Sequence, residues 1–181
     1  MARVIILNGV SSAGKTTIAK AIQQLADRDF LHVSMDVFIA MLPDGREFNA
    51  EWFPVETVAS DHGPLTRIGN GPMGERLLLQ MRAFVAELAD SGFDVIVDEV
   101  CRSRGIDAYR TLLDGHRLQI VQVTGDLGKI EQRERERGDR LVGLARAQAM
   151  NLHDDIAYDH DMDTTAASPE ECAKYILDAL A

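Results

Sequence analysis

The stretch Ile6–Thr17 reads ILNGVSSAGKTT, and its centre, Gly9–Thr16, fits the pattern G-x-x-x-x-G-K-[ST]. This pattern describes a glycine-rich loop whose backbone N–H groups surround the phosphates of a nucleoside triphosphate. The run before it, RVIILN (Arg3–Asn8), is short, apolar and rich in β-branched residues, which predicts a strand buried on both faces. After the loop, apolar residues recur at helical spacing over about 15–26. A phosphate loop between a strand and a helix therefore decides the fold class.

Two side chains of this loop have predicted roles. Lys15 is expected to reach the β- and γ-phosphates, and the Thr16 hydroxyl is expected to bind Mg²⁺. The two glycines, the lysine and the threonine in this context disfavour the alternative, a glycine-rich turn that binds nothing. The predicted nucleotide-binding residues of this region are Gly9, Val10, Ser11, Ser12, Ala13, Gly14, Lys15, Thr16 and Thr17.

Strands and helices alternate along the rest of the chain. Further strands are predicted at 31–36, 93–100, 117–125 and 158–164. Helices are predicted over 73–89, 102–115, most of 126–153 and 168–181, the last with a Ser168 N-cap, Pro169 and a capping-box Glu171. This order predicts an α/β fold with a five-stranded parallel sheet and helices on both faces. A chain of 181 residues without a repeat or linker predicts one domain, 1–181.

Residues 43–72 differ from the rest of the chain. They contain four of the five prolines and the only tryptophan, and they show no sustained period. We expect a loop-rich insertion with one short helical piece at most, on the acceptor side of the site, because irregular segments of this length are usually functional. Phe48, Trp52 and Phe53 are candidates for an aromatic wall there and, equally, for core residues.

The composition excludes several kinds of partner. The chain has 29 acidic and 19 basic residues, a formal net charge of −10, which predicts no nucleic-acid and no membrane partner. Cys101 and Cys172 stand alone, which disfavours disulfides and favours a reducing, cytoplasmic location. Neither a signal peptide nor a membrane span is predicted. The sequence leaves the oligomeric state open, a homo-oligomer included.

Acidic residues end two of the predicted strands. Ligands of a parallel α/β sheet bind at the carboxyl ends of the strands, so Asp36 is expected beside the γ-phosphate. A carboxylate there can orient an attacking hydroxyl or accept its proton, whereas the alternative role of Asp36 is to cap a helix. Asp98 is predicted to hold Mg²⁺ through water. Glu99 is expected to face either the substrate or the solvated rim of the sheet.

The run EQRERERGDR (Glu131–Arg140) concentrates arginines. Arg133 and Arg137 are four residues apart and share one helical face, where two guanidinium groups suit a triphosphate during transfer. Arg140 follows a glycine that can act as a hinge. Together they predict an arginine-bearing lid over 129–141 that excludes water. The alternative is a solvated helix stabilised by pairs of opposite charge.

Five stretches extend this pattern over most of the chain: IILNGVSSAGKTT, VSMDVFIAMLP, VIVDEV, RERERGDRLVGLARAQA and YDHDMDTTAASPEECA. Together they resemble the chloramphenicol phosphotransferase family of P-loop kinases. The resemblance implies a sheet with the phosphate-loop strand in the middle, and ATP and Mg²⁺ as co-substrates. It also implies transfer of the γ-phosphate to a hydroxyl group, which in the namesake is a hydroxyl of chloramphenicol and links the family to antibiotic resistance.

The resemblance also implies roles for individual residues. Asp36 matches the proposed base of the family, so the catalytic residues would be Asp36, Lys15, Arg133 and Arg137. Arg140 matches a further lid arginine that binds the nucleotide. The turn near the adenine would be Asp163, Thr164 and Thr165. The likeness is weakest in residues 43–72, where the acceptor is expected to bind.

The predicted activity is therefore that of an ATP-dependent O-phosphotransferase acting on a small molecule, with a chloramphenicol-like antibiotic as the first candidate. A kinase of a nucleoside, sugar or other small metabolite on the same fold is the first alternative. A nucleotide-dependent regulatory or toxin-like protein is the alternative from another class. The arginine lid and Asp36 disfavour it, because a simple switch needs neither.

Overall fold

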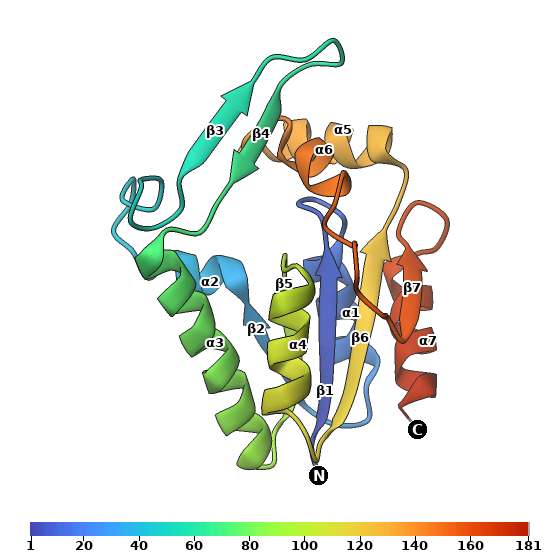
Figure 1. The fold of residues 1–181 in the computed structure, drawn as a ribbon. Coiled ribbons are helices and arrows are strands. Elements are labelled where there is room, and N and C mark those ends of the chain that lie inside the picture. The colour runs from blue at the N-terminus through green and yellow to red at the C-terminus, as the bar shows by residue number, and fades with distance from the viewer. Residues whose placement is uncertain (181) are drawn as a thin grey trace.

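The computed structural model describes residues 1–180 and contains the predicted parallel sheet (Figure 1). All neighbouring strands of this sheet pair in parallel. The phosphate-loop strand, β1, lies in the middle, which confirms the predicted fold class. In spatial order the strands are β2 (Phe30–Ser34), β5 (Asp94–Glu99), β1 (Arg3–Gly9), β6 (Arg117–Thr124) and β7 (His160–Asp163).

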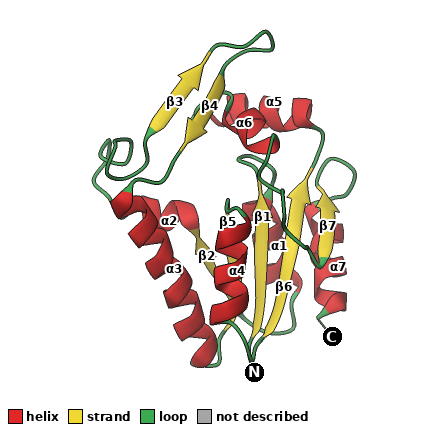
Figure 2. Ribbon diagram, viewed as in Figure 1, coloured by secondary structure: helices red, strands yellow, loops and turns green. Residues whose placement is uncertain are grey.

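Helices cover both faces of the sheet (Figure 2). One face packs against α1 (Lys15–Leu25) and α7 (Pro169–Ala179), and the other against α3 (Pro72–Asp90) and α4 (Ser103–Leu112). Ile5 and Leu7 belong to the first core. Val4 and Ile6 belong to the second core. Because β1 buries both faces, it is apolar at each of these positions, as its sequence predicts.

The carboxyl end of β1 is fixed by Gly9 and Asn8. A Cβ atom on Gly9 would lie 2.2 Å from the carbonyl oxygen of Val123, so only glycine allows β6 to approach this closely. The fully buried Asn8 side chain donates to the Cys101 carbonyl at 2.8 Å and accepts from the Cys101 N–H at 3.0 Å. Its amide also donates to the Tyr158 hydroxyl at 2.9 Å. These contacts hold the start of the phosphate loop against the chain that follows β5.

One prediction about the middle of the chain is wrong, and another omits a hairpin. The second strand ends at Ser34, and Asp36 lies in the first turn of a short helix, α2 (Met35–Ile39). The insertion contains an antiparallel hairpin, β3 (Val55–Val58) and β4 (Leu65–Ile68), and no helix. All four residues of β3 are exposed, so no alternation of apolar and polar residues announces the hairpin. Val55 and Ile68 are paired at its open end.

The chain between β6 and β7 forms two helices, α5 (Leu127–Arg137) and α6 (Leu144–Ala149). Gly138, in the left-handed conformation with φ of 70°, ends α5 where the sequence predicts a break. The predicted capping box of α7 is present, with Pro169 in its first turn. Over residues 1–180, no helix has the length and apolarity needed to cross a membrane.

Candidate active site

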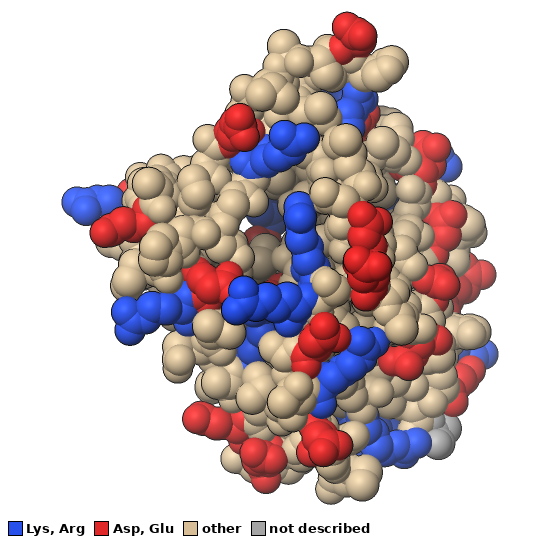
Figure 3. Space-filling model, in the orientation of Figure 1, with Lys and Arg blue, Asp and Glu red and all other residues tan. Residues whose placement is uncertain are grey.

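A cavity of about 1530 Å³ lies at the carboxyl end of the sheet. The phosphate loop, α2 and the ends of α3 and α4 contribute to its walls, together with residues 44–48 and the two helices α5 and α6. In the space-filling view, Lys and Arg side chains gather around a hollow in this region, with acidic side chains nearby (Figure 3). This position at the carboxyl ends of parallel strands is the one expected for a ligand site.

The phosphate loop adopts a tightly turned backbone. Ser12 has φ of 60° and Gly14 has φ of 101°, both in the left-handed region. Alternation of such conformations turns successive N–H groups toward one point, which makes an anion-binding concavity. The Ser12 hydroxyl oxygen is buried and has no hydrogen-bond partner among the described residues.

Lys15 begins α1 and is buried in the wall of the cavity. Its Nζ atom donates to the carbonyl oxygens of Gly9 at 2.8 Å and Val10 at 2.9 Å. The nearest carboxylate oxygen, Oδ1 of Asp98, is 4.0 Å away. Burial lowers the pKa of Lys15, and the charges of Asp98 and Asp36 oppose this shift. The lysine is thus held against the loop by two carbonyl groups.

Thr16 and Asp98 come together although they are 82 residues apart. The Thr16 hydroxyl donates to Oδ2 of Asp98 at 2.5 Å. Nε2 of His32 lies 3.8 Å from the same carboxylate oxygen; it is buried and has no hydrogen-bond partner in the part of the chain that the structure describes. Burial lowers the pKa of His32, against the opposing effect of Asp98. A hydroxyl and a carboxylate are oxygen ligands of the kind that Mg²⁺ prefers.

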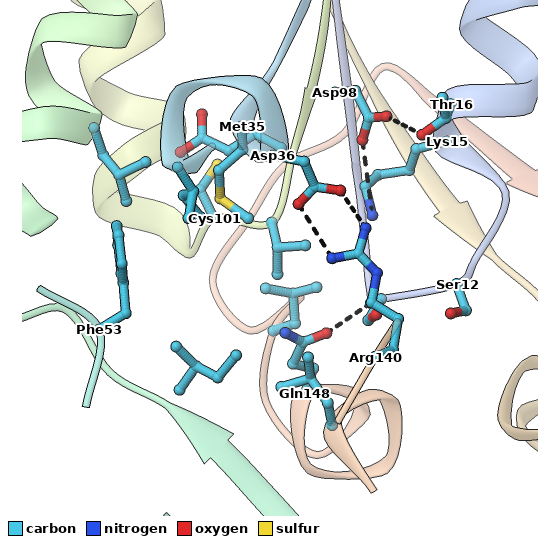
Figure 4. A pocket seen from close by; sticks show the side chains of 18 of the residues that line it. Ser12, Lys15, Thr16, Met35, Asp36, Phe53, Asp98, Cys101, Arg140 and Gln148 are labelled. Atoms are coloured by element: carbon cyan, nitrogen blue, oxygen red, sulfur yellow. Dashed lines mark hydrogen bonds and ion pairs between the residues drawn. The ribbon is translucent and has the colours of Figure 1, made fainter. Parts of the chain in front are cut away.

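Asp36 faces the same space from α2 and binds Arg140 (Figure 4). One terminal nitrogen of Arg140 donates to Oδ1 of Asp36 at 3.3 Å, and the other donates to Oδ2. This bidentate pair joins the predicted lid to the predicted base, 104 residues apart in sequence. Asp36 does not cap a helix through its side chain in this structure: the N-cap of α2 is Ser34.

The other two lid arginines have different partners. Arg133 donates to the Thr164 hydroxyl at 3.0 Å and to the Thr164 carbonyl at 3.1 Å. The same hydroxyl donates to the carbonyl of Ala13 at 2.7 Å, so Arg133 is tied to the phosphate loop through one residue. Arg137 forms two hydrogen bonds of 3.0 Å with Asp139. Arg133, Arg137 and Arg140 all line the cavity, so the structure brings the predicted set together.

Only part of the predicted turn at 163–165 reaches the cavity. Thr164 lines it, whereas Asp163 and Thr165 are not among its lining residues. Oδ1 of Asp163 accepts from the hydroxyl of Thr165 at 2.7 Å and from its N–H at 2.8 Å. The hydroxyl bond and the N–H bond lower the pKa of Asp163. Asp163 and Thr165 therefore shape the turn that places Thr164.

Glu134 connects α5 to the start of α6, a role that the sequence does not predict. It is 1% exposed, and its carboxylate accepts from the N–H groups of Gly143 and Ala145, each at 2.8 Å. In the sequence it is part of a charged run that reads as a solvated helix. One feature of the sequence indicates that Glu134 is buried: it follows Ile130, the buried apolar residue of α5, by four positions, so both lie on the inner face of the helix.

The hairpin is attached to the lid. The N–H of Thr66 donates to the Gly143 carbonyl at 3.2 Å, and its hydroxyl donates to the Val142 carbonyl at 2.8 Å. A Cβ atom on Gly143, whose φ is 86°, would lie 2.1 Å from the carbonyl oxygen of Pro64. The hairpin and the lid therefore meet through their backbones, in agreement with the ribbon view (Figure 1).

Glu99 neither lies on a solvated rim nor is free of partners. It is 1% exposed, and it accepts hydrogen bonds from a terminal nitrogen of Arg82 and, at 2.6 Å, from the Tyr109 hydroxyl. Burial raises the pKa of Tyr109 well above its usual value, and the charge of Glu99 adds to this effect. Arg82 and Glu99 both line the cavity, where they form a neutral, buried pair.

The three aromatic residues of the insertion divide between the two expected roles. Phe53 is 2% exposed and packs in the core while also lining the cavity. Phe48 is 49% exposed and lines the cavity. Trp52 packs against the core cluster and is not among the cavity-lining residues.

One residue beyond the predicted lid also contacts the phosphate loop. Gln148, in α6, accepts a hydrogen bond from the N–H of Ser11 at 2.7 Å. It lines the cavity and has no predicted role in the sequence, because a single glutamine in a helix carries no motif.

Comparison with known proteins identifies the family. Residues 2–181 match the family described as "Chloramphenicol phosphotransferase-like protein". A Mycobacterium tuberculosis protein named as a candidate O-phosphotransferase (strains H37Rv and CDC 1551 / Oshkosh) is 34% identical over 179 residues, 95% of this chain and 79% of the relative.

Three solved structures of bacterial proteins are similar to this fold. An APS kinase of Mycobacterium tuberculosis, in complex with AMPPNP and APS, has a TM-score of 0.67 at 16% identity and covers 99% of this chain and 97% of its own. A gluconokinase from Sinorhizobium meliloti 1021 has a TM-score of 0.65 at 19% identity, covering 99% and 93%. The tunicamycin resistance protein of Deinococcus radiodurans has a TM-score of 0.67 at 14% identity, covering 100% and 96%.

At these identities the structural likeness shows the P-loop kinase fold alone, and the family match adds the activity. The chain therefore belongs to the chloramphenicol phosphotransferase-like family, and it is a phosphotransferase that acts on a small molecule.

Proposed function

We propose that this phosphotransferase uses ATP and Mg²⁺ and moves the γ-phosphate to a hydroxyl group of a chloramphenicol-like antibiotic. The observation that carries the proposal is that four residues line the same cavity: Lys15, the hydrogen-bonded pair of Thr16 and Asp98, and a second acidic residue, Asp36. A metal and a phosphate chain account for the first three residues. The second carboxylate is what transfer to an alcohol needs in addition.

The residues of the loop fit a phosphate chain with its metal. The buried Ser12 hydroxyl lacks a hydrogen-bond partner among the described residues, and a phosphate oxygen would satisfy it. Thr16 and Asp98 supply the hard oxygen ligands that suit Mg²⁺. When bound, ATP supplies the phosphoryl group and Mg²⁺ neutralises part of its charge. The AMPPNP bound to the APS kinase, a protein with the same fold, supports nucleotide use here.

The proposed mechanism assigns one task to each charged residue. Lys15 and the loop N–H groups hold the phosphates, and Asp36 orients the acceptor hydroxyl and takes its proton. Arg133 and Arg137 stabilise the negative charge of the group in transfer. Arg140 occupies one lone-pair site on each oxygen of Asp36, and its release would leave both oxygens open to the acceptor hydroxyl.

The cavity walls support an acceptor that is partly apolar. Met35 and Ile39 of α2, Leu78 of α3 and Phe53 line the side of the cavity beside Asp36. The buried pair of Arg82 and Glu99 adds polar groups without net charge. A small alcohol with an apolar body and several polar groups fits such walls, and chloramphenicol is of this kind.

The test is transfer of labelled γ-phosphate from Mg·ATP to chloramphenicol, with Asp36→Asn as the control. We expect labelled product from the wild type alone, with nucleotide binding intact in the variant. If the wild type binds ATP and phosphorylates a nucleoside or a sugar instead, the kinase assignment stands and the antibiotic is replaced as acceptor. If Asp36→Asn transfers at the wild-type rate, Asp36 is not the base.

A further inference from the structure

The amide of Gln148 has a fixed orientation in the cavity wall. A backbone N–H can only donate, so the atom 2.7 Å from the nitrogen of Ser11 must be the side-chain oxygen of Gln148. The amide nitrogen, Nε2, then carries two donor hydrogens that have no hydrogen-bond partner within residues 1–180. Gln148 is therefore an oriented donor with unused capacity, placed at the edge of the phosphate loop.

These donors lie between the phosphate loop and the part of the cavity wall that contains Met35 and Phe53. Figure 4 shows the oxygen of Gln148 turned toward the loop and its nitrogen turned away from it, toward the side of the cavity where Met35 and Phe53 lie. Arg140 of the lid lies nearby and engages Asp36. Gln148, Asp36 and residues of the phosphate loop line this one cavity.

We infer that Gln148 is a catalytic residue that donates a hydrogen bond from Nε2 to the phosphoryl group in transfer; this rests on the proposed function. The amide oxygen would repel phosphate oxygens, but the N–H of Ser11 occupies it, so the loop presents only the donor end. Donors placed in advance where charge is redistributed stabilise a transition state without reorganisation.

The transfer step balances without a proton from Gln148. The bond between the γ-phosphorus and the oxygen of the leaving ADP breaks, and a bond between that phosphorus and the acceptor oxygen forms. The acceptor hydroxyl gives its proton to Asp36, and ADP leaves with the electron pair of the broken bond. Gln148 contributes only its hydrogen bond to an oxygen of the moving group.

The inference predicts selective recognition of the γ-phosphate, which can be measured without knowing the acceptor. Gln148→Glu keeps an oxygen for the N–H of Ser11 but loses the donors, and Gln148→Met loses both without adding charge. Calorimetry would give the dissociation constants of Mg·AMPPNP and Mg·ADP for each protein. We expect both variants to bind Mg·AMPPNP about tenfold or more weakly, the range of a hydrogen bond to a charged group, and to bind Mg·ADP within about threefold of the wild type.

A matched control separates this contact from the general charge of the cavity. Asn151, three residues further along, also lines the cavity, and its oxygen accepts from Arg102 at 3.0 Å. Asn151→Asp makes the same change of amide to carboxylate and is expected to leave the preference for Mg·AMPPNP over Mg·ADP unchanged. Thermal unfolding of all variants reports whether they are folded, and either Gln148 variant suffices for the comparison.

The outcomes distinguish this inference from the proposed function. A wild type that binds neither nucleotide overturns the proposed function and the inference with it. A wild type that binds both, with Gln148→Met unchanged or weakened equally for both, leaves the function standing and overturns the role of Gln148. An equal loss in Asn151→Asp also overturns it, because the effect would then be one of cavity charge.

Discussion

The two walls of the cavity are held in different ways. The nucleotide wall, named for its proposed ligand, comprises 9–17, Asp98 and Thr164 and rises from a sheet that is buried on both faces. The acceptor wall, also named for its proposed ligand, comprises 43–72 and includes a hairpin whose first strand is exposed at all four positions. It is tied to the rest by backbone hydrogen bonds, such as Met73 N–H to the Glu51 carbonyl at 2.9 Å and Thr66 N–H to the Gly143 carbonyl at 3.2 Å. The first wall is therefore set by the sheet, and the second by its neighbours.

The largest effect is expected from a change that breaks the nucleotide wall alone. Lys15→Ala removes the ammonium group that the loop carbonyls of Gly9 and Val10 now hold. We expect turnover to fall by more than about 10³-fold, because a charge placed at the phosphates is lost. Lys20→Ala, on the exposed side of the same helix, is the matched control. Wild-type turnover in Lys15→Ala would end the assignment of the phosphate loop.

The next effect tests the lid that spans the two walls. Arg137→Ala should lower kcat by about 10³-fold if this guanidinium neutralises the group in transfer. Arg135, an exposed arginine of the same helix, provides the control Arg135→Ala. Single-turnover kinetics of both variants would decide the role. Equal rates in the two variants and the wild type would leave α5 as a solvated helix.

A smaller effect is expected where the acceptor wall meets the lid. Gly143→Ala would place a Cβ atom 2.1 Å from the Pro64 carbonyl oxygen and should push the hairpin away from the lid. We expect kcat/KM for the acceptor to fall about tenfold, the equivalent of roughly 1.4 kcal/mol, with nucleotide affinity unchanged.

The hairpin itself offers the control for this change. Gly63 also has a positive φ, 103°, but a Cβ atom there meets nothing within 4 Å. Gly63→Ala therefore has the backbone strain without the collision. If kcat/KM for the acceptor falls equally in both variants, the collision with Pro64 is not the cause. If Gly143→Ala weakens nucleotide binding as well, the two walls are not independent.

The smallest expected effect is on the pH dependence of the free energy of unfolding. Burial lowers the pKa of His153 below 6.5, and its Nδ1 lies 2.6 Å from the Tyr158 hydroxyl, which in turn contacts Asn8 behind the phosphate loop. The unfolded chain binds a proton below about pH 6.5 that the folded chain does not, so the free energy of unfolding should fall as pH drops below that value. His32 acts in the same direction.

His153→Gln should therefore flatten this part of the stability profile without abolishing its slope. Urea unfolding at several pH values between about 5 and 7.5 would measure the slope. His62→Gln, in the acceptor wall, is the control. A slope that His153→Gln leaves unchanged would show that His153 is protonated equally in the folded and unfolded chains.

The sequence predicts the strand before the phosphate loop and the helix after it well because the signals are local. The apolar run of β1, the loop and the stripe of α1 follow one another within a short stretch. The acids Asp36 and Asp98 are found from the rule that ligands bind at strand ends, although Asp36 lies in α2 rather than in β2. A short helix after a strand gives no periodic signal that would separate the two.

The remainder depends on contacts between distant parts of the chain. Glu99, at the end of β5, accepts hydrogen bonds from Arg82 of α3 and Tyr109 of α4, and no sequence motif links the three residues. Gln148 meets Ser11 across 137 positions. The hairpin strands are four residues long, and β3 is exposed at every position, so no apolar periodicity announces their pairing.

The pairing of Val55 with Ile68 at the open end of the hairpin has a practical meaning for protein engineering. Since these two residues are neighbours in space, the chain between them can be cut out and replaced by another hairpin without moving either end. The sheet, the phosphate loop and the lid would serve as a constant scaffold for such replacements. Because none of residues 56–67 is among those that line the cavity, grafted hairpins would vary the surface that contacts Val142 and Gly143 and leave the cavity wall unchanged.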